Sequence, residues 1–138
     1  MADYMLDTNI CSFIIRQKPD NIRHRLNEAV QNGSVIAISM VVYAELLMGA
    51  VSPKAPKGMR DTVEAFVSGL QIMPLTSAAT VAASKIHAEL LRIGKPIGFA
   101  DRLIAGHAIS EGCICVTNNT REFARVPGLR LEDWSLLH

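Results

Sequence analysis

Three acidic residues lie next to apolar segments, and they are the side chains best suited to chemistry in this chain. Asp7 follows a short apolar run, and Asp101 precedes another. Glu45 is the only charged residue in the long apolar stretch from 34 to 53, and because burying a lone carboxylate is costly, it must reach water or a partner. Each acid also has a structural interpretation: Asp7 as a helix cap, Glu45 as a solvent-facing side chain and Asp101 as a first-turn acid favoured by the helix dipole.

Acting together, these three carboxylates could hold a divalent cation. Acids gathered at one rim repel one another, and a hard cation such as Mg²⁺ or Mn²⁺ relieves that repulsion. Such an ion polarises a phosphodiester and lowers the pKa of an attacking water, so no Cys or His nucleophile is required. The four histidines lack ligand spacing; His87 and His107 fall within helical segments and are interpreted as structural, and the others are His24 and His138.

A second polar segment follows the apolar run at 113–116. Thr117 and Asn119 can donate and accept hydrogen bonds, and Asn119 can order a metal-bound water although it supplies no charge. Glu122 has two interpretations, as a fourth carboxylate acting directly or through water, or as a solvated side chain paired with a nearby arginine.

Short apolar strands alternate with the helices that must position these residues. Strands are expected at 3–6, 35–38, 72–73, 113–116 and 129–131. Helices are expected at about 8–16, 20–32, 40–50, 59–70 and 76–91, and from the turn that holds Asp101 to 111, with a short helical turn within 117–122. This alternation predicts a three-layer α/β/α sandwich with a central, mostly parallel sheet. Sites in such sheets form beyond the carboxyl ends of the strands, where Asp7 and Thr117 fall.

Length and composition fit one cytoplasmic domain spanning 1–138. The chain has 138 residues, of which 49% are hydrophobic, enough for a sizeable core. A net charge of +1 argues against binding duplex DNA mainly through phosphates, although the basic groups at 16–25 and 54–60 could act locally or be solvated helix faces. The three cysteines lack metal or redox spacing and are interpreted as buried residues in a reducing compartment. No export signal is visible, and the apolar stretch 35–51 is too short to span a membrane.

Five of these segments together resemble the motifs of VapC toxins of the PIN-domain family, along nearly the whole chain. They are MLDTN at 5–9, YAELxxG at 43–49, DRLIAGHA at 101–108, VTNNTREF at 116–123 and EDW at 132–134. The resemblance implies a homodimeric PIN-like endoribonuclease that depends on Mg²⁺ or Mn²⁺. It also implies a VapB-type antitoxin that neutralises the toxin, with operator DNA bound only through that antitoxin and no contact with membranes. Similar proteins of enteric bacteria cleave initiator tRNA in the anticodon loop, so tRNA is the expected RNA substrate.

The resemblance also assigns residues. The first three acidic ligands of the family fall on Asp7, Glu45 and Asp101, which are the predicted metal ligands. A further acid found in many PIN domains is replaced here by Asn119, and Glu122 is the candidate substitute. The predicted catalytic residues are therefore Asp7, Glu45, Asp101, Asn119 and Glu122.

Three other functions were weighed against this one. A phosphoacceptor domain needs paired acids after the first strand and a late lysine, but no lysine follows Lys95. A haloacid-dehalogenase-like phosphatase needs a second Asp two places after the first, where this chain has Asn9. A non-catalytic RNA-binding or interaction module with the same fold remains the alternative, because Asn119 stands where an acid is expected.

Overall fold

Five short strands form one sheet in the order β3-β2-β1-β4-β5 in the computed structural model, which describes residues 1–136. The strands are β1 (Tyr4–Leu6), β2 (Ile36–Ser39), β3 (Gln71–Met73), β4 (Ile114–Val116) and β5 (Leu131–Glu132). Every pairing is parallel, and Tyr4 of β1 lies opposite Ile36 of β2 on one side and Ile114 of β4 on the other. Parallel neighbours require crossover connections, which the helices supply.

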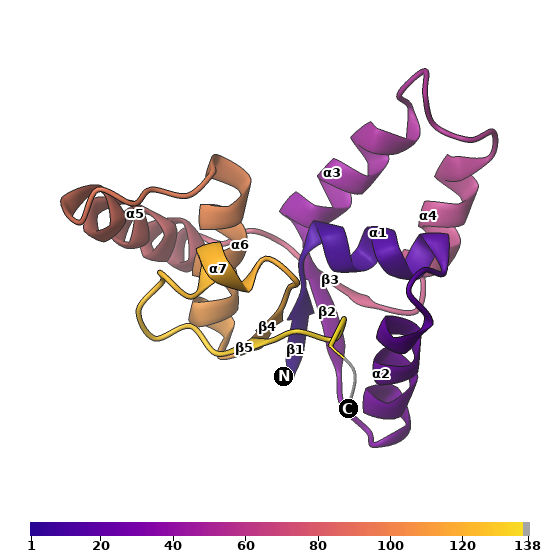
Figure 1. The fold of residues 1–138 in the computed structure, drawn as a ribbon, viewed down its shortest axis with the longest axis horizontal. Helices are drawn as coiled ribbons and strands as arrows, with labels where there is room; N and C mark the ends of the chain where they lie inside the picture. The colour runs from indigo at the N-terminus through magenta and orange to yellow at the C-terminus, as the bar shows by residue number, and fades with distance from the viewer. Residues whose placement is uncertain (137–138) are drawn as a thin grey trace.

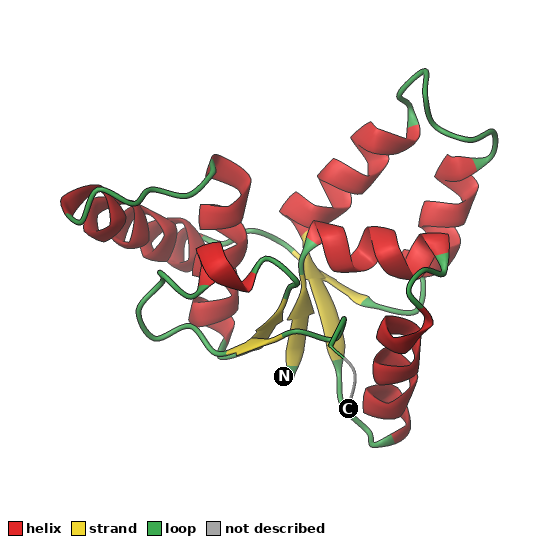
Figure 2. Ribbon diagram, viewed as in Figure 1, coloured by secondary structure: helices red, strands yellow, loops and turns green. Residues whose placement is uncertain are grey.

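Helices cover both faces of this sheet. They are α1 (Thr8–Arg16), α2 (Asp20–Gln31), α3 (Met40–Ala50), α4 (Met59–Val67), α5 (Ser77–Arg92), α6 (Phe99–Glu111) and α7 (Thr120–Phe123). Right-handed crossovers put α1 to α4 on one face and α5 to α7 on the other. The two groups lie apart in Figure 1, and Figure 2 shows the strands between them. The predicted three-layer α/β/α sandwich is confirmed.

Side-chain caps explain where three of the helices begin. Asp7 Oδ1 accepts a hydrogen bond from the backbone N–H of Ile10 at 2.9 Å, at the start of α1. Ser39 Oγ accepts from the N–H of Val41 at 3.2 Å, at the start of α3. Thr76 caps α5 in the same way, so each of these helix starts has the short polar residue that satisfies an otherwise unpaired N–H.

The expected elements are all present, with small shifts at their ends. The helix expected at 59–70 ends at Val67, before Ser68 and Gly69. The last strand lies at Leu131–Glu132 rather than 129–131, because its pairing with β4 matches Val116 to Glu132. The interpretation of His138 as a histidine without ligand spacing, and the end of the predicted domain 1–138, lie outside the described residues.

Most of the core is aliphatic, and it includes the three cysteines, which are free and buried. Helices α5 and α6 approach each other closely at Gly106, where an added Cβ would lie 2.6 Å from the backbone nitrogen of Ala83. None of the helices within residues 1–136 combines the length and the apolar character needed to cross a bilayer. The apolar stretch 35–51 was expected to be a buried strand leading into a buried helix; the strand is buried, but α3 buries only Val42 and Leu46 and exposes Met40 and Met48.

Candidate active site

The strand order creates a crevice beyond the carboxyl ends of β1 and β4. The chain runs outward from β1 to β2 and β3, then returns to place β4 on the other side of β1 and continues to β5. At such a reversal the flanking connections leave in opposite directions, which opens a space for ligands. Asp7 directly follows β1, and Thr117 directly follows β4. Asp7 N donates to Val116 O at 3.0 Å, which holds the two strand ends together.

Asp7 is both the cap of α1 and the most deeply buried acid of the crevice, with an exposed fraction of 4%. Burial raises its pKa to about 6, although hydrogen bonds from the Thr117 side chain and the Ile10 N–H oppose that rise. The negative charges of Asp101 and Glu45 raise the pKa of Asp7 further. The two interpretations of Asp7, as a cap and as a site residue, are therefore compatible.

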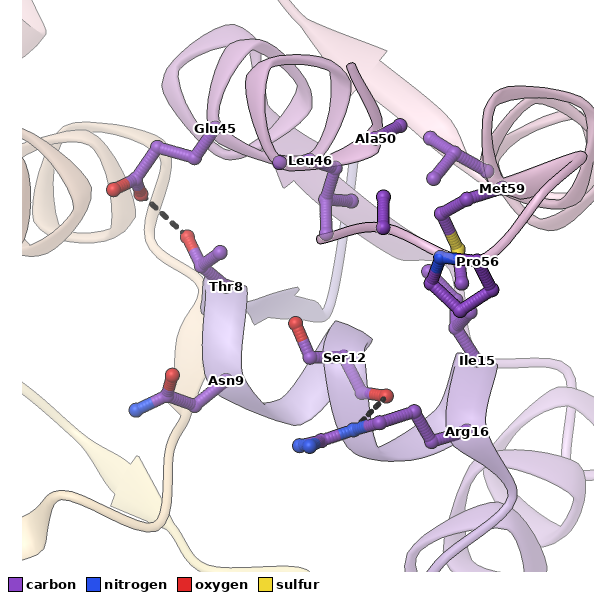
Figure 3. Close-up of a pocket in the computed structure, with 13 residues that line it drawn as sticks. Thr8, Asn9, Ser12, Ile15, Arg16, Glu45, Leu46, Ala50, Pro56 and Met59 are labelled. Atoms are coloured by element: carbon purple, nitrogen blue, oxygen red, sulfur yellow. Dashed lines mark hydrogen bonds between the residues drawn. The ribbon is translucent and has the colours of Figure 1, made fainter. Parts of the chain in front are cut away.

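Asp101 and Glu45 reach the same crevice from opposite faces of the sheet. Asp101 lies in the first turn of α6 and is half-buried; burial raises its pKa, and the charges of Glu122 and Glu45 add to the rise. Glu45 lies midway along α3, and its Oε1 accepts a hydrogen bond from Thr8 Oγ1 at 2.5 Å (Figure 3). The charges of Asp101 and Glu45 thus act on Asp7, and the charge of Glu45 acts on Asp101, as the sequence predicted for acids at one rim.

The loop after β4 contributes Asn119 and Glu122. Asn119 Nδ2 donates to Glu122 Oε2 at 2.9 Å, and the Asn119 N–H donates to Thr117 Oγ1 at 2.9 Å. The charge of Glu122 lies near enough to Asp101 to raise the pKa of that carboxyl. Its other interpretation, a side chain paired with an arginine, is not what the structure has.

Among the described residues 1–136, no ion pair neutralises these four acids. The ion pairs within residues 1–136 join Arg25 to Glu132 and Arg92 to Glu89, and neither involves the crevice. In the same part of the chain, no three His, Cys, Asp or Glu side chains stand close enough together to enclose a metal ion by themselves. The donor set is nonetheless made of carboxylate oxygens with a buried, uncompensated acid at its centre. That chemistry fits a hard divalent cation, which keeps several waters in its coordination shell.

Comparisons with known proteins agree with this geometry. The family model for the PIN domain matches residues 4–129. The chain belongs to the PIN-domain family. It is 47% identical over 135 residues to the tRNA(fMet)-specific endonuclease VapC of Shigella flexneri, which covers 98% of this chain and 100% of that relative. It is therefore a VapC-type PIN domain.

Solved structures give the same result. DNA-bound VapBC from Salmonella typhimurium matches with a TM-score of 0.89 and 44% identity, covering 97% of this chain and 99% of that one. VapBC2 from Rickettsia felis, bound to a DNA fragment from its promoter, matches with a TM-score of 0.88 and 40% identity, covering 95% and 98%. The fold of this PIN domain is thus that of proteins solved in toxin–antitoxin complexes.

A cavity of about 310 Å³ opens beside the acids of this PIN domain, between α1, α3 and α4. Glu45 and Thr8 stand at one end of it, and Leu46, Pro56 and Met59 form an apolar wall at the other (Figure 3). A ligand in the cavity would therefore lie against apolar surface and within reach of the crevice.

Two features of the site were not foreseen from the sequence. Thr8 holds Glu45 across 37 positions, and its only sequence signal is its place directly after Asp7. His107 was expected to be structural, but nothing in the sequence indicates that it pairs with Ser39. The polar residues buried within residues 1–136 are Asp7, Ser39, His107 and Thr117. Three of the four end or follow a strand, so buried polarity is concentrated at this edge of the sheet.

Proposed function

We propose that this PIN domain is a metal-dependent endoribonuclease, the toxin of a toxin–antitoxin pair that hydrolyses RNA phosphodiester bonds. Its expected substrate is initiator tRNA, cut in the anticodon loop, with Mg²⁺ or Mn²⁺ as the ion. The names of its relatives support the ribonuclease class, since they include a tRNA(fMet)-specific endonuclease and the ribonuclease VapC2 of Rickettsia felis.

The observation that carries the proposal is the buried acid Asp7, whose charged neighbours are Asp101 and Glu45 and which has no basic partner in the part of the chain that the structure describes. A fold maintains such repulsion only if something compensates for it, because like charges in a site of low polarity destabilise one another. A divalent cation held by Asp7, Glu45 and Asp101 provides that compensation. The same arrangement is hard to explain in a module that only binds RNA, since bare carboxylates repel phosphates.

Different residues of the site would have different roles in hydrolysis. Asp7 is held in place by the Ile10 N–H and by Thr117, so its carboxylate is ordered before substrate arrives. Thr8 holds Glu45 and Asn119 holds Glu122 by hydrogen bonds, and the charges of both acids act on Asp101. A bound Mg²⁺ or Mn²⁺ would polarise the phosphodiester and lower the pKa of the attacking water. Glu122 is hydrogen-bonded to Asn119, and its carboxylate would be available to accept a proton from the attacking water.

Partner binding follows from the same comparisons. The similar solved structures are complexes that contain VapB and VapC, so we propose a VapB-type antitoxin as the partner that neutralises this chain. Operator DNA would be bound through that antitoxin, in agreement with a net charge of only +1. A homodimer is the expected state. Exposed apolar residues near the α5–α6 pair, Val81, Leu91 and Phe99, are compatible with such an interface.

Cleavage of a total tRNA pool by the purified, antitoxin-free protein tests the proposal. Reactions with Mg²⁺, with Mn²⁺ and with EDTA are run beside Asp7→Ala and Asp101→Asn. We expect one discrete tRNA product that requires the metal and both acids, and mapping its new end identifies the cut. RNA binding without turnover in either metal would contradict the proposal and favour a non-catalytic module, with Asn119 as the leading reason.

A further inference from the structure

Ser39 and His107 form a hydrogen bond at the centre of the molecule, between the two halves of the acid site. Ser39 Oγ and His107 Nδ1 lie 2.8 Å apart, across 68 positions of the chain. Both residues are fully buried, each with an exposed fraction of 0%. Ser39 ends β2 and caps α3, whereas His107 lies in the middle of α6. The bond therefore joins the helix that carries Glu45 to the helix that carries Asp101.

An imidazole at this position has a cost that an apolar side chain would avoid. Nε2 of His107 has no hydrogen-bond partner in the described part of the chain, and a buried polar atom without a partner destabilises the folded state. Burial lowers the pKa of His107, while Glu111, one turn along α6, opposes that shift. The ring is therefore neutral, and it contributes neither charge nor a second hydrogen bond. What it does contribute is one directional link to Ser39.

The same two helices must hold their acids at a set separation. Glu45 follows Ser39 by six positions on α3, and Asp101 precedes His107 by six positions on α6. Six residues span about 9 Å of helix, so a rotation of a few degrees about the link would move each carboxylate by roughly 0.5–1 Å. Metal affinity depends on displacements of that size, since ligand distances vary within about 0.2 Å. On its other side, α6 is already fixed by the close contact of Gly106 with α5.

We propose that the Ser39–His107 hydrogen bond positions Glu45 and Asp101 relative to each other and thereby sets the metal affinity of the acid site. His107 and Ser39 are positioning residues that touch neither the ion nor the RNA. This inference rests on the proposed function for the identity of the ligand, a divalent cation at Asp7, Glu45 and Asp101. It adds two residues, one at the end of β2 and one in α6, whose effect on the site is indirect.

Calorimetric titration of Mn²⁺ into the purified protein measures this effect without reference to catalysis. His107→Leu removes the link together with the unpaired nitrogen, so we expect a melting temperature no lower than that of the wild type. We expect its Mn²⁺ dissociation constant to rise about tenfold, the size of effect seen when an outer partner of a metal ligand is lost. At fixed Mn²⁺, kcat should fall while KM for RNA stays unchanged, because no RNA contact is altered.

Conservative variants separate positioning from simple packing. His107→Asn places an amide near the position of Nδ1 and should recover part of the Mn²⁺ affinity, and Ser39→Thr should recover most of it. Ser39→Ala should weaken Mn²⁺ binding about as much as His107→Leu does. The double variant should bind no worse than either single one, because both changes remove the same bond.

Thr76→Ala is the matched control for the helix cap that Ser39→Ala also removes. Thr76 caps α5 through Ala79 N, so its loss should lower the melting temperature by a few degrees and leave Mn²⁺ affinity unchanged. A folded His107→Leu protein with wild-type Mn²⁺ affinity would overturn the proposal. So would a Mn²⁺ affinity that falls in step with stability in every variant, Thr76→Ala included. Wild-type protein that binds Mn²⁺ but cuts no RNA would instead contradict the proposed function and would not contradict the positioning role.

Discussion

Glu132 and Asp7 are carboxylates at the carboxyl ends of two strands of one sheet, but their surroundings are opposite. Glu132 ends β5, and its Oε1 accepts hydrogen bonds from Trp134 Nε1 at 2.9 Å and from Arg25 Nη2 at 3.3 Å. The Arg25 guanidinium also lies over the Trp134 ring, 5.9 Å from its centre, and Tyr4 packs edge-on against the same ring. The carboxylate of Glu132 is thus part of a neutralised cluster that attaches the end of the chain to the core.

Asp7 has no such compensation. Its hydrogen bonds come from neutral donors, the Ile10 N–H and the Thr117 side chain, and its charged neighbours are Asp101 and Glu45. A paired acid stabilises the structure in which it is found, whereas an unpaired acid among other acids stabilises a state with a cation present. The comparison teaches that the surroundings of a carboxylate, rather than its residue type, separate a structural role from a functional one.

The sharpest test of the comparison is Asp7→Asn, which keeps an acceptor for the Ile10 N–H but removes the charge. We expect RNA cleavage to fall at least about a hundredfold. Metal-free stability at pH 7.5 should rise, because the folded carboxyl holds its proton more tightly than the unfolded one. The stability that Asp7 contributes is present below pH 3.8 and is lost as the pH rises through about 6.

Cleavage rates with Mg²⁺ or Mn²⁺ measure the first effect, and thermal melts at pH 4.5 and 7.5 without metal measure the second. Asp7→Ala is the control, since it also loses the cap and should cost about 1 kcal/mol relative to Asp7→Asn. An Asp7→Asn protein that retains cleavage would remove the distinction between the two acids.

The counterpart is Glu132→Ala, which should damage the fold and spare the chemistry. The indole N–H of Trp134, a residue with an exposed fraction of 1%, would lose its acceptor, and stability should fall by about 2 kcal/mol. Glu132→Gln keeps an acceptor for Trp134 and loses only the charge opposite Arg25, so it should cost less than 1 kcal/mol. Urea unfolding gives these values, and cleavage measured where each variant is folded should match the wild type. A large loss of activity in folded Glu132→Gln would contradict a purely structural role.

A smaller effect is expected from Asn119→Asp, which adds an acid where many PIN domains have one. The new carboxylate would stand about where Asn119 Nδ2 now donates to Glu122 Oε2, so repulsion replaces a hydrogen bond. We expect the melting temperature in EDTA to fall by about 3 °C, equivalent to roughly 1 kcal/mol, and Mn²⁺ to restore it. Asn118→Asp is the control, because Asn118 is exposed and should respond weakly in both conditions. An equal response of the two variants would argue that Asn119 does not face the acid site.

The smallest effect should come from Thr8→Val, which keeps the shape of the side chain and loses the bond to Glu45. We expect cleavage to drop by about fivefold, the equivalent of one hydrogen bond of about 1 kcal/mol. Thr8→Ser keeps the hydroxyl and should cut RNA at close to the wild-type rate. Initial rates of tRNA cleavage decide the matter, and equal rates for the Val and Ser variants would mean that Glu45 needs no support from α1.

Much of the fold was predictable from local patterns. Alternating strand and helix segments predicted the layers, and the short polar residue Asp7 marked a helix start that the structure confirms. The ends of elements were less predictable, as with the last strand, because pairing between β4 and β5 decides which residues are extended. The roles of Asp7, Glu45, Asp101, Asn119 and Glu122 as metal ligands or catalytic residues stay predictions.

The sequence by itself determined the inventory of the site: three acids, each beside an apolar segment, and a polar loop after the fourth strand. Local chemistry suffices for that, because caps, turns and periodicity act over a few residues. Only the tertiary structure decided which polar groups meet. Strand order and helix packing decide the Thr8–Glu45 hydrogen bond, the proximity of Glu122 to Asp101 and the Ser39–His107 hydrogen bond. Contacts of that kind span tens of residues, and no local pattern encodes their partners.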